Sequence, residues 1–431
     1  MTAGAETGAP GTRAPVVSHE LLGRVARPWV ARFSIAWFGI WIAQLTPIQL
    51  LLPEQVTNVL RLDPADWVAN VVAFGVVSAI AGVFALVAYP LTGALSDRTL
   101  SRFGRRRPWI AGGAVLFAGA LILLGAQNTI GGVTVFWVLA LVGFCVLTAA
   151  LTAVISDQVP IGQRGTVSSW MAAPQPIGVL LGLIAVVALG LSLLEGYVLV
   201  AVLLVVCVAV FVLRMPDRVL LPSERPRLTV AAFIRGFWID PRTHPDFGWT
   251  LLSRILVNWS NALTTTLLLY FLMFGLHLSE TPAETVLLIT TVIYSIFSVV
   301  ASLWFGRLSD KLGRRKLFVV ITAIMQALAG VLLIVAPSET MVFVAGALSG
   351  FGFGAFLAVD QALATEVLPN AVDWGKDLGI MNIAYAIPQA LAPLAGAALV
   401  VVVGGFWLLF VGVIVFGIAG ALALGPVKGV R

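Results

Sequence analysis

Charged side chains are scarce in this sequence. Asp, Glu, Lys and Arg together make up 11% of its 431 residues, whereas soluble proteins average about 25%. Apolar residues make up 60%, against roughly 45–50% in soluble proteins, and the mean hydropathy is +1.02. Because so little charge cannot cover a water-exposed surface, the composition excludes an ordinary soluble protein and predicts a chain embedded in a lipid bilayer.

Residues that build metal centres, disulfides and catalytic clusters are also rare. The two cysteines, Cys145 and Cys207, lie inside apolar stretches, where we expect small apolar fillers and no disulfide framework. The three histidines, His19, His244 and His277, are scattered outside those stretches. The sequence has no Gly-x-x-x-x-Gly-Lys motif, which argues against an ATP-driven pump. We therefore predict that the protein is not an enzyme and holds no metal or organic cofactor.

The first residues of the chain lack a hydrophobic core. Residues 1–31 are rich in Gly, Ala, Pro and Thr, so we expect no cleavable signal peptide. The first long apolar stretch is then expected to act as the membrane-insertion signal.

Long apolar stretches make up most of the remaining chain. A membrane-spanning helix needs about 20 predominantly apolar residues, and the sequence offers twelve such stretches. The expected spans are 33–52, 68–92, 109–127, 134–155, 166–190, 196–213, 249–273, 284–305, 317–336, 341–365, 377–402 and 406–424. The predicted fold class is therefore all-α: a polytopic membrane protein with 12 transmembrane helices.

Basic residues are distributed unevenly between the two sets of connections. Of the 26 Lys and Arg residues, all but Arg61 and Arg254 fall in the two tails and in the connections after spans 2, 4, 6, 8 and 10. Because Lys and Arg favour the cytoplasmic side, we expect a multi-pass protein of the cell membrane with both termini in the cytoplasm. The net charge of +6 then reflects contact with anionic lipid and requires no nucleic acid partner.

A basic turn occurs twice. The first copy is Gly93-Ala-Leu-Ser-Asp-Arg-Thr-Leu-Ser-Arg-Phe-Gly-Arg-Arg-Arg-Pro108, and the shorter second copy is Gly306-Arg-Leu-Ser-Asp-Lys-Leu-Gly-Arg-Arg-Lys316. A second echo joins Asp157-Gln-Val-Pro160, which ends span 4, to Glu366-Val-Leu-Pro369, which ends span 10. The duplication predicts two pseudo-symmetric six-helix bundles, an architecture that many secondary transporters use.

The longest polar connection, rich in Pro and charge, lies at 214–248. The predicted organisation is a cytoplasmic tail (1–31), a first bundle (32–213), a cytoplasmic linker (214–248), a second bundle (249–424) and a second cytoplasmic tail (425–431).

The repeated turn resembles the signature of the major facilitator superfamily, and the resemblance covers nearly the whole chain. The longer form between Ser96 and Pro108, together with Leu45-Thr46-Pro47, is similar to plant sucrose–proton symporters and their animal relatives. One departure is clear. Those symporters carry an arginine shortly before the acidic residue that ends span 4, whereas Leu151-Thr152-Ala153 precede Asp157 here. The resemblance therefore implies the superfamily fold without implying disaccharide specificity.

The resemblance also implies a role for the basic turns. In the superfamily, ion pairs at these turns hold the cytoplasmic gate shut and break when it opens. Arginine suits such pairing because its guanidinium can bond carboxylates and exposed carbonyls together. A role in membrane topology alone is the alternative. The residues expected at this gate are Asp97, Arg98, Arg105, Arg106, Asp157, Asp310, Lys311, Arg314, Arg315 and Glu366.

Asp360 is a carboxylate placed well inside an apolar span. It lies about six residues before the end of span 10, which corresponds to ~9 Å at 1.5 Å per residue. Intramembrane carboxylates are costly, face the interior of the bundle and often relay protons. We therefore predict proton coupling at Asp360. A structural ion pair, including one with Arg254, and direct binding of substrate are the alternatives.

Polar side chains recur at helical spacing on three spans. On span 7, steps of four, three and four residues place its polar residues on one face, and amides offer both donors and acceptors to sugar hydroxyls. Interhelical hydrogen bonds or aromatic packing are the alternatives, and Arg254 could instead snorkel to the inner surface. The expected substrate-binding residues are Trp37, Trp41, Gln44, Arg254, Asn258, Asn261, Thr265, Asn382, Tyr385 and Gln389.

These patterns together predict a transporter that works by alternating access. We expect proton-coupled uptake of a small polar solute, most simply a sugar or glycoside, with the proton as coupling ion. A proton-coupled efflux antiporter for drugs or metabolites in the same architecture is the alternative. The expected partners are the small-molecule substrate and the lipid bilayer, and the resemblance implies a monomer.

Overall fold

The computed structural model describes residues 25–60, 67–160, 163, 167, 170–171, 173–224, 243–312, 315–366 and 374–427. Within these ranges, the side chains of 60, 156, 306–307, 309–311, 315, 361–366, 374–383, 386 and 390 are outside the described part. Helices account for all the regular secondary structure of the described residues.

The first half of the chain begins with one long, interrupted helix. It comprises α1 (Arg27–Thr46), the π-helical turn η2 (Pro47–Leu51) and α2 (Leu52–Leu60). Pro47 removes one backbone donor, and the turn that follows it is wound as a π-helix. The other helices are α3 (Trp67–Ser96), α4 (Arg107–Gly125), α5 (Ile130–Gln158), α7 (Gln175–Ala188) and α8 (Leu193–Val212).

The second half repeats this arrangement after a short 3-10 turn, η4 (Pro222–Glu224). Its helices are α10 (Pro245–Thr266), α11 (Leu268–Tyr270), the π-helical η5 (Phe271–Gly275), α12 (Glu280–Leu312), α13 (Arg315–Val335), α14 (Glu339–Glu366), α15 (Trp374–Val403) and α16 (Trp407–Leu422). Among the described residues, eight helices are long and apolar enough to cross a membrane, a bent pair makes one more span, and three apolar helices are shorter. They match the predicted spans one for one and confirm the predicted fold class.

Local sequence signals set several helix ends. Ser192 and Glu195 form a reciprocal capping box at the start of α8, which satisfies two backbone donors that a helix start leaves free. Thr129 caps α5 by accepting a hydrogen bond from the amide of Gly132. The helix α12 continues to Leu312, seven residues beyond the predicted end at 305. The prediction followed the apolar stretch, whereas the helix includes the polar residues after it.

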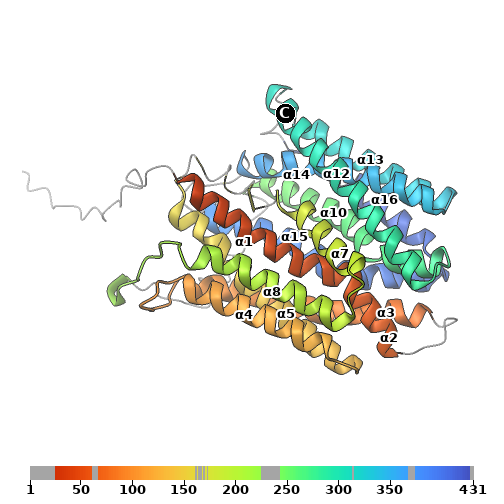
Figure 1. Cartoon of the computed structure of the whole chain (residues 1–431). Coiled ribbons are helices and arrows are strands. Elements are labelled where there is room, and N and C mark those ends of the chain that lie inside the picture. Colours follow the sequence, from red (N-terminus) through yellow and green to blue (C-terminus); the bar gives the residue numbers. More distant parts are fainter. Residues whose placement is uncertain are drawn as a thin grey trace, which may run out of the picture.

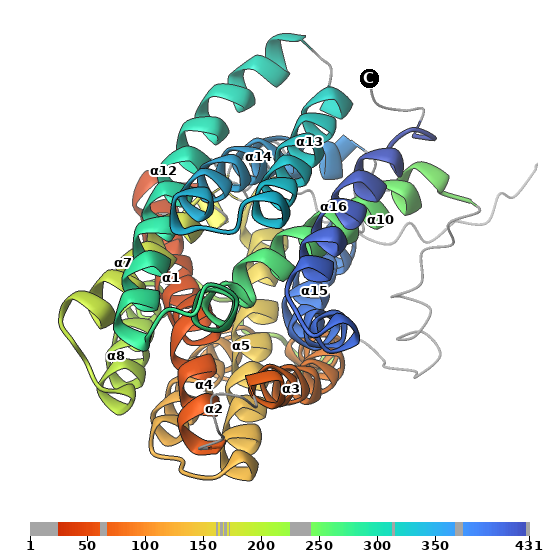
Figure 2. The same cartoon turned by 90° about the vertical axis from the view of Figure 1, so that its right-hand side faces the viewer.

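The helices of each half pack mainly on one another, and two helix pairs make most of the contacts between the halves (Figures 1 and 2). Helix α3 lies against α15, and α7 lies against α12. A Cβ at Gly75 would stand 2.9 Å from the Cα of Leu394, so the first of these contacts requires glycine. Such small-residue contacts let helix backbones approach closely in membranes.

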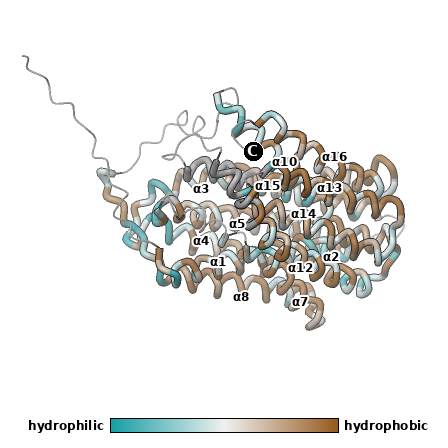
Figure 3. The backbone as a smooth tube through the Cα atoms, turned by 90° about the horizontal axis from the view of Figure 1, so that it is seen from above, coloured by the Kyte–Doolittle hydropathy of each residue, from teal (hydrophilic) through white to brown (hydrophobic). Residues whose placement is uncertain are grey.

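Hydrophobic residues make up much of the helices (Figure 3), and many large apolar side chains are exposed on the outer surface. Val115 of α4 is 67% exposed and Trp304 of α12 is 60% exposed, which would be unfavourable in water. The buried polar residues lie instead inside the helix bundle. This inside-out distribution is what a bilayer environment demands.

Candidate functional site

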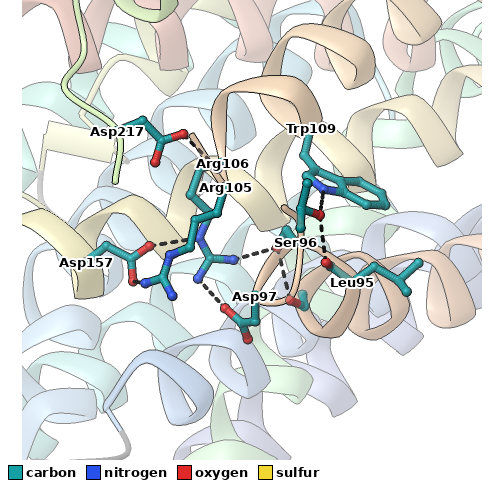
Figure 4. A network of polar contacts seen from close by, with 10 residues as sticks. Leu95, Ser96, Asp97, Arg105, Arg106, Trp109, Asp157 and Asp217 are labelled. Carbon is teal, nitrogen blue, oxygen red and sulfur yellow. Dashed lines mark hydrogen bonds and ion pairs between the residues drawn. The ribbon is translucent and has the colours of Figure 1, made fainter. Parts of the chain in front are cut away.

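The first basic turn is organised around one buried arginine, Arg106 (Figure 4). Its Nε lies 2.8 Å from Oδ2 of Asp157, its Nη2 pairs with Oδ1 of Asp97, and its Nη1 donates to the Ser96 hydroxyl at 2.5 Å. Arg105 pairs with the other oxygen of Asp157 at 2.5 Å. The end of α5 is therefore tied to the end of α3 through the turn that begins α4.

Arg106 stays protonated in this environment. Its side chain is only 4% exposed, and burial alone would lower its pKa. The carboxylates of Asp157 and Asp97 outweigh burial and raise the pKa above its ordinary value. The guanidinium therefore acts as a permanent positive centre for the acidic groups around it.

Asp217 closes the same network from the connection after α8. Its Oδ2 accepts hydrogen bonds from the backbone amides of Arg106 and Arg107 at 2.8 and 2.7 Å, so it serves the free amides at the start of α4. Gly104 has a φ of +100°, and a Cβ there would lie 2.3 Å from the Asp217 carboxylate. The motif glycine is thus needed both for the backbone turn and for the approach of Asp217.

Other predicted gate residues can be placed only in part. Arg98 is half-buried just after α3. The second copy of the turn lies largely outside the described residues: Arg314 is not described, and nothing is described of the side chains of Asp310, Lys311, Arg315 and Glu366.

A second charged pair lies inside the second half. The Nη2 of Arg254 on α10 is 3.1 Å from Oδ2 of Asp360 on α14. Both side chains are buried, with exposed fractions of 6% for Arg254 and 4% for Asp360. The Nε and Nη1 of Arg254 are buried and have no hydrogen-bond partner among the described residues. Of the two alternatives for Arg254, the structure shows the ion pair with Asp360. The Arg254 side chain is buried in the bundle and does not extend to the membrane surface.

The polar face of α10 continues from this pair toward the middle of the helix. Asn258 donates to the backbone oxygen of Arg254 at 2.8 Å. Asn261 accepts a hydrogen bond from the Tyr294 hydroxyl of α12 at 3.2 Å, and Thr265 donates to the backbone oxygen of Asn261 at 3.0 Å. The four polar residues predicted on this span therefore face the inside of the bundle, away from lipid.

One small cavity, about 30 Å³ in volume, lies between the first half and α15. Gln44, Tyr385 and Gln389, which the spacing analysis placed on two different spans, all line it. Ser78 of α3 lines it too, and the Gln44 Oε1 and Ser78 Oγ are buried without a hydrogen-bond partner in the part of the chain that the structure describes. At this volume the cavity has room for only one or two water molecules, to which these polar atoms could bond.

Aromatic side chains close this region from the side of α1. Trp41 donates to the backbone oxygen of Met171 at 2.9 Å, and its ring packs edge-on against Tyr385 with centroids 5.6 Å apart. The Tyr385 hydroxyl accepts a hydrogen bond from Gln175 at 2.8 Å, which joins α15 to α7. Trp37 is buried beside Trp41, with the two ring centroids 5.6 Å apart. The side chain of Asn382 is outside the described part.

A second cavity, about 50 Å³, lies within the second half. Thr265 and Tyr294 line it, and Gln49 reaches it from the first half. The predicted stripe on α10 therefore borders a hollow through Thr265, while Asn261 contacts its wall through Tyr294.

The two halves are also joined at the end opposite the basic turns. The ring of Trp67 stacks on Phe274 and Phe406 of the second half, with centroids 5.9 and 5.2 Å apart. The Tyr270 hydroxyl donates to the backbone oxygen of Pro53 at 3.2 Å. This end of the molecule is closed in the structure.

Several residues at these places were not predicted from sequence. Asp217 lies in a polar connection where nothing local marks it as a helix cap. Ser78 sits singly in an apolar span, and Tyr294 stands beside Ser295 in another; only their polarity at membrane depth is a signal. Gln175 follows Pro174 at the start of α7, and nothing in the local sequence indicates its contact with α15.

Comparisons with known proteins agree with this architecture. The family profile of the Major Facilitator Superfamily matches residues 33–292 and 250–429. The crystal structure of the human organic anion transporter MFSD10 (TETRAN) is similar with a TM-score of 0.67 and 14% identity, over 92% of this chain and 99% of that one. The crystal structure of a bacterial homolog of the human lysosomal transporter Spinster, in an inward-facing and unoccupied conformation, is similar with a TM-score of 0.66 and 15% identity, over 93% of this chain and 97% of that one. The crystal structure of the nucleoside transporter NupG has a TM-score of 0.67 and 14% identity to this chain, over 93% of this chain and 98% of that one.

Proposed function

Because the chain belongs to the major facilitator superfamily, we propose that it is a secondary transporter that moves a small polar solute together with a proton. Alternating rocking of the two halves would expose the central cavities to each side in turn. In this proposal the basic turns face the cytoplasm, as the distribution of Lys and Arg favours.

The observation that carries the proposal is the buried Arg254–Asp360 pair. Two charges at membrane depth are retained at a high cost in desolvation, and two nitrogens of Arg254 have no hydrogen bond to any described residue. Protonation of Asp360 would release Arg254, and α10 connects Arg254 directly to Asn258. Proton binding at the pair and solute binding along α10 are then linked through one helix.

The chemistry of the cavities supports a sugar or glycoside as the solute. Amides and hydroxyls from Gln44, Gln389, Ser78 and Tyr385 line the cavity beside α15, and such groups pair with sugar hydroxyls as donors and acceptors. The cavity is only about 30 Å³ in this structure, so in this proposal a sugar enters after rocking of the halves enlarges it. Trp137 lines the same cavity.

Uphill uptake tests the coupling assignment. One proton moving down 100 mV supplies about 2.3 kcal/mol, enough for roughly 40-fold accumulation. In proteoliposomes with an imposed proton gradient, Asp360→Asn should abolish accumulation and its pH dependence while downhill exchange of solute persists. The control is Glu339→Gln, which neutralises an exposed carboxylate in the first turn of α14. Normal uphill uptake by Asp360→Asn would show that the coupling site lies elsewhere.

One observation favours efflux of an apolar compound as a second candidate. A groove of about 880 Å³ opens between α1 and the segment leading into α7, and Phe38, Trp170 and Ile177 line it with other apolar side chains. A thermal-shift screen of the purified protein against sugars, amino acids and cationic drugs separates the two candidates. Stabilisation by sugars supports uptake of a polar solute, whereas stabilisation by drugs alone overturns it.

A further inference from the structure

Arg254 is paired through only one of its three guanidinium nitrogens in the part of the chain that the structure describes. Its Nη2 contacts Oδ2 of Asp360 at 3.1 Å, whereas its Nε and Nη1 are buried without a partner there. The donors of a buried charged group are costly to leave unpaired, and burial keeps bulk water away from them. Arg254 therefore has spare donors for an acceptor that the described side chains do not supply.

The neighbouring turns of α10 leave these donors unpaired. Asn258, one turn later, donates its amide to the backbone oxygen of Arg254. Thr250, one turn earlier, is 1% exposed, and its hydroxyl also has no hydrogen-bond partner among the described residues. Residues four apart share a helix face, and helical side chains lean over the turn that precedes their own. This stretch of α10 thus carries a hydroxyl and two guanidinium nitrogens that the described residues do not pair.

The geometry of the Arg254–Asp360 pair determines what the guanidinium can bind. A carboxylate binds arginine best through two parallel hydrogen bonds along one edge of the planar group. The two edges that offer such a fork are Nε with Nη2 and Nη1 with Nη2, so Nη2 belongs to both. Asp360 contacts this shared nitrogen, and neither Nε nor Nη1 bonds to its second oxygen. Asp360 therefore uses one nitrogen and blocks both forks.

We propose that the transported solute carries a carboxylate, which Arg254 binds through one of these forks once Asp360 is protonated. Among the described residues, Arg254 is the charged side chain that acts on Asp360. Protonation would neutralise Asp360 and release Nη2, and the solute carboxylate would restore one negative charge beside the buried positive one. Hydroxyls of the solute would pair with the amide and hydroxyl groups on the polar face of α10. The substrate class is then a hydroxylated monocarboxylate, such as a sugar acid.

This substrate class deepens the proposed function and rests on its alternating access. Arg254 lines neither of the two central cavities. It lies nine residues after the start of α10, or ~14 Å at 1.5 Å per residue, so opening at the end of the basic turns would expose it. A proton and a monoanion that cross together move no net charge, whereas a proton and a neutral sugar move one positive charge.

Binding of acids and of their neutral amides tests the substrate class. The full-length protein in nanodiscs of uncharged lipid is titrated with lactate, gluconate and glucuronate, and with the amide of each, by isothermal calorimetry. At least one acid should bind saturably, and its amide should bind about 10-fold more weakly or worse. No binding of any of the three acids, or equal binding of acid and amide, overturns the proposal.

Two arginine variants test the binding group. Arg254→Lys keeps the charge but loses the planar fork, so acid binding should weaken about 10-fold. Arg102→Gln removes an exposed arginine and should bind as the parent does. Unchanged acid binding by an Arg254→Lys protein that elutes as the parent does in size exclusion would show that the acid binds elsewhere.

Asp360→Asn tests the exchange of partners without altering Arg254. Asparagine mimics the neutral form of Asp360, so this variant should bind the acid about 5-fold more tightly than the parent or better. Weaker binding by Asp360→Asn would overturn the competition between Asp360 and the solute. The comparison of acid with amide uses the unaltered protein, so it decides the substrate class even where a variant fails to fold.

Transport in proteoliposomes separates this inference from the proposed function. Accumulation of the bound acid should follow the pH difference and should not respond to a potassium diffusion potential set with valinomycin. Accumulation that follows the potential would overturn the exchange of one proton for one carboxylate at this pair. Uphill uptake of a neutral sugar without acid binding would refute the substrate class and leave proton-coupled transport intact. Acid binding with normal uphill uptake by Asp360→Asn would refute the coupling site and leave the Arg254 site intact.

Discussion

At the scale of single residues, the buried charges determine what the site can do. Arg106 has its three guanidinium nitrogens engaged by Asp157, Asp97 and Ser96, whereas Arg254 has one engaged by Asp360. A fully engaged arginine holds structure together. An arginine with spare donors can bind something else, which is why we place the coupling proposal at Arg254 and the structural network at Arg106.

The Arg254–Asp360 pair should show strong coupling in stability. Asp360→Ala leaves a buried guanidinium without its partner, which typically costs about 3–5 kcal/mol. The double variant Arg254→Met with Asp360→Leu removes both charges and should recover most of that loss. Denaturant unfolding of the purified variants measures both values, and equal destabilisation by the single and double changes would contradict mutual pairing.

Gly104 should be far less replaceable than a nearby glycine of α4. Gly104→Ala places a Cβ against Asp217 at a positive φ, for which we expect a loss of about 1–3 kcal/mol. Gly112 has open space around its Cα, so Gly112→Ala should be neutral or stabilise by up to about 1 kcal/mol. Thermal unfolding compares the two, and similar effects would show that Asp217 does not constrain the turn.

At the scale of helices, the ends carry information that hydropathy does not. Helix α8 starts at a complete capping box, so Ser192→Ala should destabilise the protein by about 1 kcal/mol. Thr285→Ala on α12 is the control, because that exposed hydroxyl bonds only to its own helix. Hydrogen exchange at the start of α8 should rise in the first variant alone, and unchanged exchange there would count against the cap.

At the scale of the whole molecule, the contacts between halves decide which end is closed. Tyr270→Phe removes the hydrogen bond to Pro53 and should shift the population toward opening at that end. A cysteine placed at Gln49, which lines the second cavity, should then react faster with an impermeant maleimide added at that side, in a chain whose two native cysteines are replaced by alanine.

The matched control for that shift is Trp407→Phe, which changes an exposed aromatic residue at the start of α16. Its labelling rate should equal that of the parent. Faster labelling in both variants would indicate general loosening, and no change in the Tyr270 variant would mean that the aromatic stack of Trp67 with Phe274 and Phe406 suffices for closure.

Membrane embedding, the helical fold and the duplicated halves followed from sequence alone, because hydropathy and repetition are properties read along one dimension. The polar face of α10 and the pairing of Asp157 with the first basic turn could also be predicted from the sequence, since helical spacing and charge type are local properties. Which groups meet depends on how each helix is rotated and which neighbour it crosses. Only the tertiary structure could therefore decide that Arg254 meets Asp360 and that Asp217 caps α4.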